Sequence, residues 1–259
     1  MKTLKLYSII NFRDQNYPVF ESNFIKSIQS GCAIQSAYPH SLQDHVGDNI
    51  SSQNPLYGEL TAHYWVWKNA PKADYIGFCH YRRFFQLKYR WLWQKRNVEY
   101  PPISPKELQK RWASHYSNEK IILKLLNQYD IILPRRMRFR QTIAEHYQLN
   151  HGDYTWFTHE FYAYFPDLKE TFDTFFFKNK LFVPTLLFIT SYQTFNHFMT
   201  WMFGFLFHLH STAQAEGRLL QERELAYIAE RLFGFYFCYV AKLNILYKKL
   251  DLLIPPSHS

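Results

Sequence analysis

Residues 44–85 read DHVGDNISSQNPLYGELTAHYWVWKNAPKADYIGFCHYRRFF. Pro55 follows a polar loop and suits the first turn of a helix, where a missing backbone N–H costs nothing. Apolar side chains then recur at helical spacing at Leu56, Leu60, Tyr64 and Trp67. The pattern predicts an amphipathic helix that ends where Pro71 interrupts it.

A short apolar run, Tyr75–Cys79, follows that helix and predicts a buried strand. The polar residues His80, Tyr81, Arg82 and Arg83 come directly after it. In open α/β sheets, ligands bind outside the carboxyl ends of the strands. We therefore expect these four residues to lie where a substrate binds.

The rest of the chain continues to alternate between strand and helix patterns. Strands are predicted at Leu4–Ile10, Cys32–Gln35, Tyr129–Pro134 and, as a strand pair or a strand and loop, Leu181–Ile189. Helices are predicted at Phe20–Ser30, Asn118–Gln128, from Thr142, within 153–177, at Thr194–His210 and at Leu220–Tyr239. This order predicts an α/β, Rossmann-type single domain with a mostly parallel central sheet and a helical C-terminal part.

That domain is expected to span residues 1–250. The basic, aromatic segment 88–112 reads as an insertion or lid, and residues 251–259 as a frayed tail. Hydrophobic residues make up 47% and charged residues 20%, so the chain is globular rather than disordered. Glycine is scarce, and neither a G-x-G-x-x-G nor a P-loop pattern occurs, which argues against a glycine-rich nucleotide loop.

The formal charge of +9 fits three classes of partner: nucleic acid, an anionic membrane surface, or an anionic small substrate. No Lys/Arg-rich stripe or nucleic-acid motif favours the first. Three widely spaced cysteines form neither a zinc pattern nor a disulfide framework, and so predict a reducing cytosol. Residues 181–215 lack charge, but polar side chains interrupt them, so we expect a buried core or a membrane-resting surface rather than a span.

Four segments together resemble a known bacterial family: GDNIS at 47–51, ELTA at 59–62, YW at 64–65 and GFCHYRRFF at 77–85. Weaker similarity runs through residues 129–134, 147–153 and 223–232. The family is associated with capsular, exopolysaccharide and lipopolysaccharide biosynthesis and was long filed as a domain of unknown function. The resemblance implies a GT-A-type glycosyltransferase, with galactofuranosyl and related transfers among its members.

We therefore expect transfer of galactofuranose, galactose or a related hexose from a nucleotide-sugar donor, with uridine diphosphate as carrier. The expected acceptor is a growing surface polysaccharide or a lipid-linked glycan. Such an enzyme would work in the cytoplasm, at the inner face of the membrane. The rival interpretations are a non-catalytic protein that binds glycan or anionic lipid on the same fold, and, on charge alone, a nucleic-acid binder.

The sequence contains no Asp-x-Asp, the pattern with which many GT-A enzymes hold a metal. Arginine binds phosphate oxygens in a bidentate fork, so Arg82 or Arg83, assisted by His80, is predicted to neutralise the diphosphate without a metal. Strand alternation predicts that only one of the two arginines faces the site. The alternative is that an arginine pairs with a surface carboxylate.

The other expected donor-binding residues are Asn11, Asp48, Asn49, Ser51, Glu59 and Arg223. The loop residues among them, 48, 49 and 51, also fit an Asx-turn and a helix cap that serve only the backbone. Glu59 also fits a solvated carboxylate on a helix, and only the resemblance raises it to a candidate.

Transfer with inversion, which we favour, needs a base beside the acceptor hydroxyl. Asp153 is the first candidate and Glu230 the second; the alternatives are a helix cap and an ordinary surface charge. Trp91, Trp93 and Trp112 lie in the basic, proline-flanked segment and are expected to form a platform for the acceptor sugar or to rest on anionic lipid.

Overall fold

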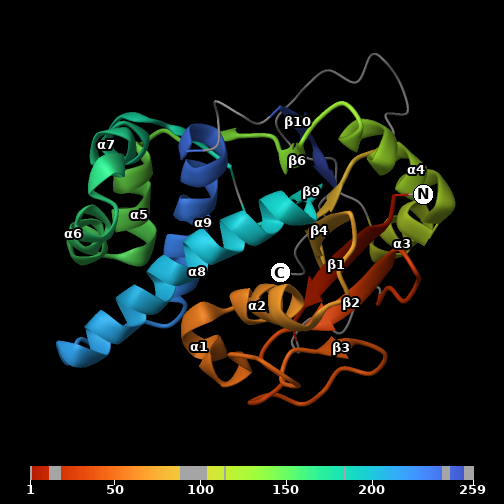
Figure 1. Cartoon of the computed structure of the whole chain (residues 1–259), viewed down its shortest axis with the longest axis horizontal. Helices are drawn as coiled ribbons and strands as arrows, with labels where there is room; N and C mark the ends of the chain where they lie inside the picture. The colour runs from red at the N-terminus through yellow and green to blue at the C-terminus, as the bar shows by residue number, and fades with distance from the viewer. Residues whose placement is uncertain are drawn as a thin grey trace.

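The computed structural model of the chain describes residues 2–11, 19–87, 104–113, 115–183, 185–240 and 246–253. A seven-stranded sheet in the order β10-β6-β9-β4-β1-β2-β3 forms its centre (Figure 1). The strands are β1 Leu4–Ile10, β2 Ile25–Gln29, β3 Leu42–Gln43, β4 Tyr75–His80, β6 Ile131–Pro134, β9 Ile189–Ser191 and β10 Tyr247–Leu250. Only β9 runs antiparallel to its neighbours, so the sheet is mostly parallel, as predicted.

Helices cover both faces of this sheet. They are α1 Asn54–Tyr57, α2 Leu60–Asn69, α3 Pro105–Ala113, α4 His115–Leu126, α5 Ile143–His151, α6 Thr155–Tyr164, α7 Lys169–Lys178, α8 Tyr192–Ala215 and α9 Glu224–Phe235. Shorter elements are the 3-10 turns η1 Ser51–Gln53 and η2 Pro166–Leu168 and the π-helical turn η3 Tyr236–Val240. Two small sheets pair β5 Phe84–Phe85 with β11 Leu252–Leu253, and β7 Met137–Arg138 with β8 Leu181–Phe182.

The central strand β4 separates two hydrophobic cores. Ile76 and Phe78 face a large core that also contains α2 and the C-terminal helices, whereas Tyr75 and Cys79 face a smaller core beneath α3 and α4. Successive side chains of a strand point to opposite faces, so a strand buried on both faces reads as a continuous apolar run. This explains why the sequence pattern located β4 correctly.

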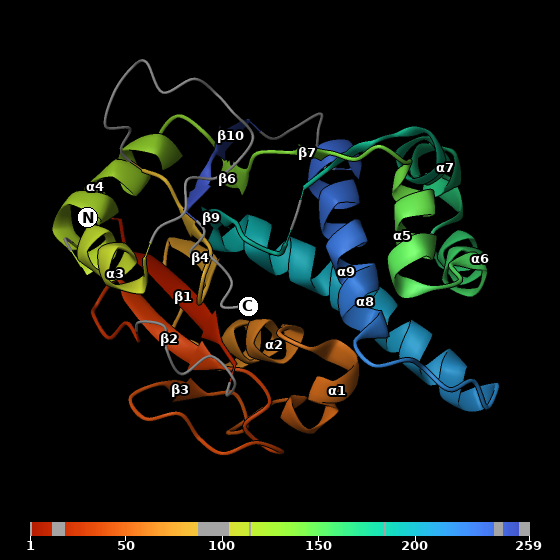
Figure 2. The same ribbon diagram turned by 180° about the vertical axis from the view of Figure 1, so that it is seen from behind.

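The C-terminal helices gather on one side of the sheet. Figures 1 and 2 show α5, α6 and α7 as a group, with α9 between them and the sheet and α8 running from the sheet past α9. The apolar face of α8 is buried: Phe195, Met199, Met202, Phe203 and Leu206 are each at most 1% exposed. The predicted α/β class, with its helical C-terminal part, is confirmed.

Trp112 belongs to the smaller core and not to a surface platform. It is 1% exposed, and its ring lies 5.1 Å from that of Phe84 and 6.4 Å from that of Phe24. A buried tryptophan offers no face to a sugar, so its prediction as an acceptor-binding residue is wrong. Trp91, Trp93 and most of the expected lid lie outside the described residues.

Two other local predictions are also wrong. Residues 20–30 were expected to be a helix, but Phe20 and Ser27 are joined by two hydrogen bonds that lead into strand β2. Cys32–Gln35, expected to be a strand, lies in turns. At the other end of the chain, Leu252 and Leu253 are 1% and 3% exposed and pair with β5, so this part of the expected tail is held in the core.

Gly77 is the position in β4 at which the sheet tolerates no side chain. A Cβ there would lie 2.7 Å from Leu6 Cδ2, 2.8 Å from Ile189 Cγ1 and 2.8 Å from the backbone oxygen of Phe188. We expect Gly77→Ala to lower the free energy of unfolding by about 1 to 3 kcal/mol, because a backbone atom cannot move aside without disturbing the pairing of β9. Urea denaturation measures this loss.

The matched control is Gly204→Ala in helix α8. A Cβ at Gly204 would meet only the hydroxyl of Tyr164, at 3.3 Å, and alanine favours a helix. This control is expected to leave the unfolding midpoint unchanged or slightly raised. Equal midpoints for the two variants would contradict the explanation.

Candidate functional site

The carboxyl end of β4 turns sharply at His80. The N–H of His80 donates to the oxygen of Arg83 at 3.1 Å, and the N–H of Arg83 donates back to the oxygen of His80 at 2.9 Å. Tyr81 and Arg82 form the tip of this turn, and the N–H of Tyr81 donates to the oxygen of Ile9 at 2.8 Å. The prediction that strand alternation separates the two arginines is therefore wrong, since the strand ends before them.

The turn also brings the ends of β1 and β4 together. Ile9 pairs with His80 in the parallel register, and Asn11 comes directly after β1. Asn11 therefore lies at the same edge of the sheet as the turn. Its expected role in donor binding stays a prediction.

Glu59 meets His80 from the neighbouring helix. It stands immediately before α2, after Gly58, whose φ of +54° ends α1 and redirects the chain. Glu59 Oε2 lies 3.1 Å from His80 Nε2, and their side chains are only 17% and 15% exposed. The helix start and the strand end thus face each other, and this contact excludes the solvated-carboxylate alternative for Glu59.

The pKa of Glu59 is lowered from 4.5 to about 2. Burial alone would raise this pKa, but attraction to His80, the hydrogen bond from His80, and then His63 and Arg83, outweigh it. The pKa of His80 is also lowered, mainly because burial disfavours the charged imidazole, with Glu59 opposing that effect. At neutral pH the pair is therefore a carboxylate beside a neutral imidazole.

Glu230 joins this group from helix α9. Burial raises the pKa of Glu230, Arg231 opposes the rise, and the Glu59 carboxylate adds to it. Arg83 and Arg223 then lower it. Because these charges act on one carboxylate, residues from α2, the β4 turn and α9 form a single electrostatic cluster, which we call the edge cluster: Glu59, His80, Arg83, Arg223 and Glu230.

Arg231 supports Glu230 from inside the protein. It is 1% exposed and donates to Glu230 Oε2 at 3.2 Å and to the oxygen of Tyr227 at 3.1 Å. Its guanidinium lies over the ring of Tyr147, 5.2 Å from the centroid. Arg231 is therefore not a surface charge, and its buried guanidinium holds the Glu230 carboxylate in place.

Arg223 reaches the cluster through an unusual backbone conformation. Its φ is +61°, which is uncommon for a residue with a side chain. Its N–H donates to the oxygen of Pro55 at 2.7 Å, and a Cβ on Gly58 would lie 3.2 Å from its Nε. The glycine between α1 and α2 thus leaves room for the Arg223 side chain, which lies over their junction.

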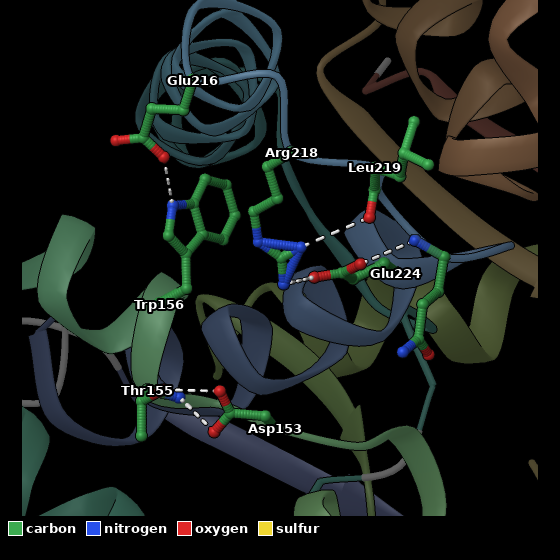
Figure 3. A network of polar contacts seen from close by, with 8 residues as sticks. Asp153, Thr155, Trp156, Glu216, Arg218, Leu219 and Glu224 are labelled. Carbon is green, nitrogen blue, oxygen red and sulfur yellow. Dashed lines mark hydrogen bonds and ion pairs between the residues drawn. The ribbon is translucent and has the colours of Figure 1, made fainter.

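A polar network holds the loop that precedes Arg223 (Figure 3). Arg218 pairs with Glu224 at 2.9 Å and lies over the ring of Trp156, 4.3 Å from the centroid. Trp156 in turn donates to Glu216 at 3.0 Å. Loop 216–223 is therefore fixed against both α6 and α9. Sequence reasoning missed this polar network, because its members are brought together only by the packing of three helices.

Asp153 lies beside the polar network of Arg218 rather than in the edge cluster. Its carboxylate accepts hydrogen bonds from the N–H and the hydroxyl of Thr155, at 3.0 and 2.5 Å (Figure 3). These bonds lower the pKa of Asp153 and occupy both of its oxygens at the start of α6. The geometry fits the helix-start alternative, and of the two predicted bases only Glu230 lies with Glu59 and Arg83.

The polar loop before α1 is largely occupied with its own backbone. Ser51 is 0% exposed, donates to Asp44 Oδ1 at 2.5 Å and accepts from the N–H of Ala33 at 3.0 Å. The buried Asp44 carboxylate also accepts from the N–H groups of Gly31 and Cys32. Ser51 therefore has no exposed surface that a nucleotide-sugar donor could contact, so its predicted role in donor binding is wrong.

Asp48 and Asn49 belong to the loop before α1, and this loop contacts α2 toward its C-terminal end. Asp48 accepts from the hydroxyl of Tyr64 at 3.0 Å and contacts Asn69, the last residue of the helix. Asn49 accepts from the N–H of Ser51, as an Asx-turn does. Ten helical residues span about 15 Å, so the structure does not bring this pair to Glu59. Their donor-binding role remains a prediction.

Residues 8–241 match the family model "Domain of unknown function (DUF4422)". The chain belongs to this family.

A solved structure described as a WbbM bifunctional glycosyltransferase in its apo form is similar to the chain, with 25% sequence identity and a TM-score of 0.80. The match covers 98% of this chain and 46% of that one, so the chain spans about half the length of its structural relative. No curated protein matches the sequence. The likeness supports the predicted GT-A-like fold.

Two features are absent from the described part of the chain. No group of three or more His, Cys, Asp or Glu side chains in it is placed to hold a metal ion. None of its helices combines the length and the apolar character of a membrane span.

The buried Glu59 makes the stability of the protein depend on pH. Since the folded-state pKa lies below 4.5, the ionised Glu59 stabilises the native state above that pH, and the contribution is lost as the pH falls toward about 2. The difference in free energy of unfolding between wild type and Glu59→Gln is therefore expected to be present above pH 4.5 and to shrink as the pH falls from there toward about 2. Urea denaturation at a series of pH values measures it.

The control is Glu222→Gln, which makes the same change of charge at an exposed position. Its difference from wild type is expected to be small at every pH. A Glu59→Gln difference that does not vary with pH would contradict the assignment of Glu59 as a buried, ionised carboxylate.

Proposed function

We propose that the protein transfers a glycosyl group from a nucleoside diphosphate sugar to a glycan acceptor. The observation that carries this proposal is the edge cluster. It places two arginines, two carboxylates and a histidine at the carboxyl end of β4 in a fold like that of a glycosyltransferase. In sheets of this kind, that edge is where substrates bind.

Arg83 and Arg223 are the proposed ligands of the diphosphate. Their positive charges act on Glu230 from two different elements, the turn after β4 and the loop before α9, so an anion in the edge cluster would be attracted by both. The bond from the anomeric carbon to the phosphate oxygen breaks in the reaction, and the leaving diphosphate keeps the electron pair. Two arginines neutralise the charge that develops on it.

Glu230 is the proposed base. Its carboxylate takes the proton of the acceptor hydroxyl while the acceptor oxygen forms its bond to the anomeric carbon, with inversion. Burial raises the pKa of Glu230, and a raised pKa makes a carboxylate a stronger proton acceptor at neutral pH. Arg231, which donates to Glu230 Oε2, opposes the rise in the pKa of that carboxylate and orients it before the substrate arrives.

The finer features of the proposal rest on the sequence. We propose a uridine diphosphate carrier, a hexose such as galactofuranose or galactose, and an acceptor that is a growing surface polysaccharide or a lipid-linked glycan. The excess of positive charge suits an anionic membrane surface, where such an acceptor would be held, on the cytoplasmic side. The arginines take the place of a metal ion in this scheme.

Loss of one arginine tests the proposed diphosphate site. We expect Arg83→Ala and Arg223→Ala each to weaken binding of a UDP-sugar by about ten- to a hundredfold, since each removes a charge-assisted hydrogen bond. Calorimetry with UDP-glucose, UDP-galactose and UDP-galactofuranose measures the affinity, and release of free sugar measures the slow hydrolysis of the donor.

Arg140→Ala is the matched control, because it removes the same charge at an exposed position after β7. It is expected to bind the donor as wild type does. Wild-type affinity in both edge-cluster variants would contradict the proposed site. Tight donor binding without hydrolysis or transfer would instead favour a non-catalytic binding protein.

Removal of metal ions tests the proposed role of the arginines separately. Donor hydrolysis is expected to continue at its full rate in excess EDTA, because Arg83 and Arg223 supply the positive charge. The measurement compares rates with EDTA, after dialysis, and after addition of Mg²⁺ or Mn²⁺. Complete loss of activity with EDTA, restored by either ion, would sink the metal-free scheme.

A further inference from the structure

Two buried polar atoms in the turn after β4 have no hydrogen-bond partner among the described residues. They are His80 Nδ1 and Arg82 Nε. Buried polar groups in proteins are nearly always hydrogen-bonded, and one that is not calls for an explanation. The two atoms lie in adjacent parts of one turn, at the edge of the sheet where a substrate is expected.

The first of these atoms is a hydrogen-bond acceptor. His80 Nε2 lies 3.1 Å from the Glu59 carboxylate, and a carboxylate can only accept. Nε2 must therefore carry the hydrogen, and in a neutral imidazole this leaves Nδ1 with a lone pair. The contact with Glu59 thus sets the tautomer of His80 and fixes what its other nitrogen can recognise.

The second atom is a hydrogen-bond donor. Arginine carries N–H groups and no acceptor, so Arg82 Nε can only donate. The guanidinium of Arg82 lies over the ring of Tyr81, 5.4 Å from its centroid. Tyr81 also contacts His80, with 4.1 Å between the ring centroids. One aromatic ring thus packs against both residues and holds them on the same turn.

An acceptor beside a donor selects the chemistry of the ligand. A phosphate or carboxylate oxygen has no hydrogen to give to Nδ1 at neutral pH, and an ammonium group has no lone pair to accept from Arg82. A hydroxyl group does both. Sugars and ribose are the substrates that bring hydroxyl groups to the site proposed above.

We propose that His80 and Arg82 together bind one hydroxyl group of the substrate, which donates to His80 Nδ1 and accepts from Arg82 Nε. This inference rests on the proposed function and deepens it. His80 then binds a hydroxyl group and does not assist in binding the diphosphate. The two arginines of the turn have different roles. Arg83 serves the phosphates, and Arg82 serves the hydroxyl. Glu59 is a positioning residue that acts through His80.

The test uses two amide substitutions that separate the nitrogens of His80. His80→Asn keeps an acceptor near the place of Nδ1 but is too short to reach Glu59. His80→Gln keeps a donor near the place of Nε2, and so the contact with Glu59, but loses the acceptor. A merely structural role for the Glu59 contact predicts that the Gln variant is the better one, whereas hydroxyl binding predicts that the Asn variant is.

The probes are UDP and UDP-galactose with their deoxy analogues, in which one hydroxyl of the ribose or of the galactose is missing. Wild type is expected to bind one deoxy analogue about tenfold more weakly than its parent, since a buried polar group is left unpaired. His80→Gln is expected to bind both forms with the same reduced affinity, and His80→Asn to retain most of the difference. The affected analogue shows whether the hydroxyl belongs to the ribose or to the sugar.

An acceptor hydroxyl gives a different pattern. Donor binding and donor hydrolysis then stay at the wild-type level in His80→Gln, while transfer to a galactose-terminated oligosaccharide falls by about tenfold through a higher KM for the oligosaccharide. Thermal denaturation checks that each variant is folded. If His80→Gln does not fold, Arg82→Lys replaces it, since it keeps the charge but has no Nε at that position.

The inference is overturned if His80→Gln matches wild type with every parent ligand, every deoxy analogue and the oligosaccharide, while His80→Asn is impaired. It is also overturned if wild type binds every deoxy analogue as tightly as its parent and His80→Gln transfers the sugar to the oligosaccharide at the wild-type rate. If the wild-type protein still binds and hydrolyses the donor in that case, the proposed function stands although this inference fails. A wild type that binds no UDP-sugar overturns both.

Discussion

Burial of β4 on both faces is the constraint on which the rest of the structure depends. Ile76 and Phe78 are each 0% exposed on one face, and Cys79 is 1% exposed on the other. A strand enclosed in this way can be polar only where it leaves the sheet. Its first polar side chains, His80 and the arginines of the turn, therefore emerge at the carboxyl edge, next to the start of α2.

The edge cluster places opposite charges in a partly buried setting, which is costly unless they compensate each other. Glu59 is balanced by His80 and Arg83, and Glu230 is balanced by the buried Arg231. This arrangement orients the side chains before any ligand arrives. Binding and catalysis both benefit from groups that need no rearrangement, which is why such a cluster is a better functional candidate than any single charged residue.

Local signals predicted those elements whose determinants lie within a few residues. Strand β4, helix α8 and the start of α5 at Thr142 all formed as expected. Glu145 completes a capping box with Thr142. Residues 20–30, which contain β2, were mistaken for a helix because Phe20, Phe24 and Ile28 follow helical spacing. Their side chains are buried by a hairpin-like entry into the sheet, and a single sequence does not reveal such pairing.

The sequence by itself determined the α/β class, the segment that forms the site, and the absence of an Asp-x-Asp pattern there. Only the tertiary structure decided which polar residues belong together. In it, Glu59 contacts His80, and Glu230 and Arg223 join them in one cluster. Ser51 instead donates to the buried Asp44, and Trp112 lies in the core. The physical reason is that charges and hydrogen bonds act over a few ångströms in space. Residues 59, 80 and 230 come within that range only when the helices pack on the sheet.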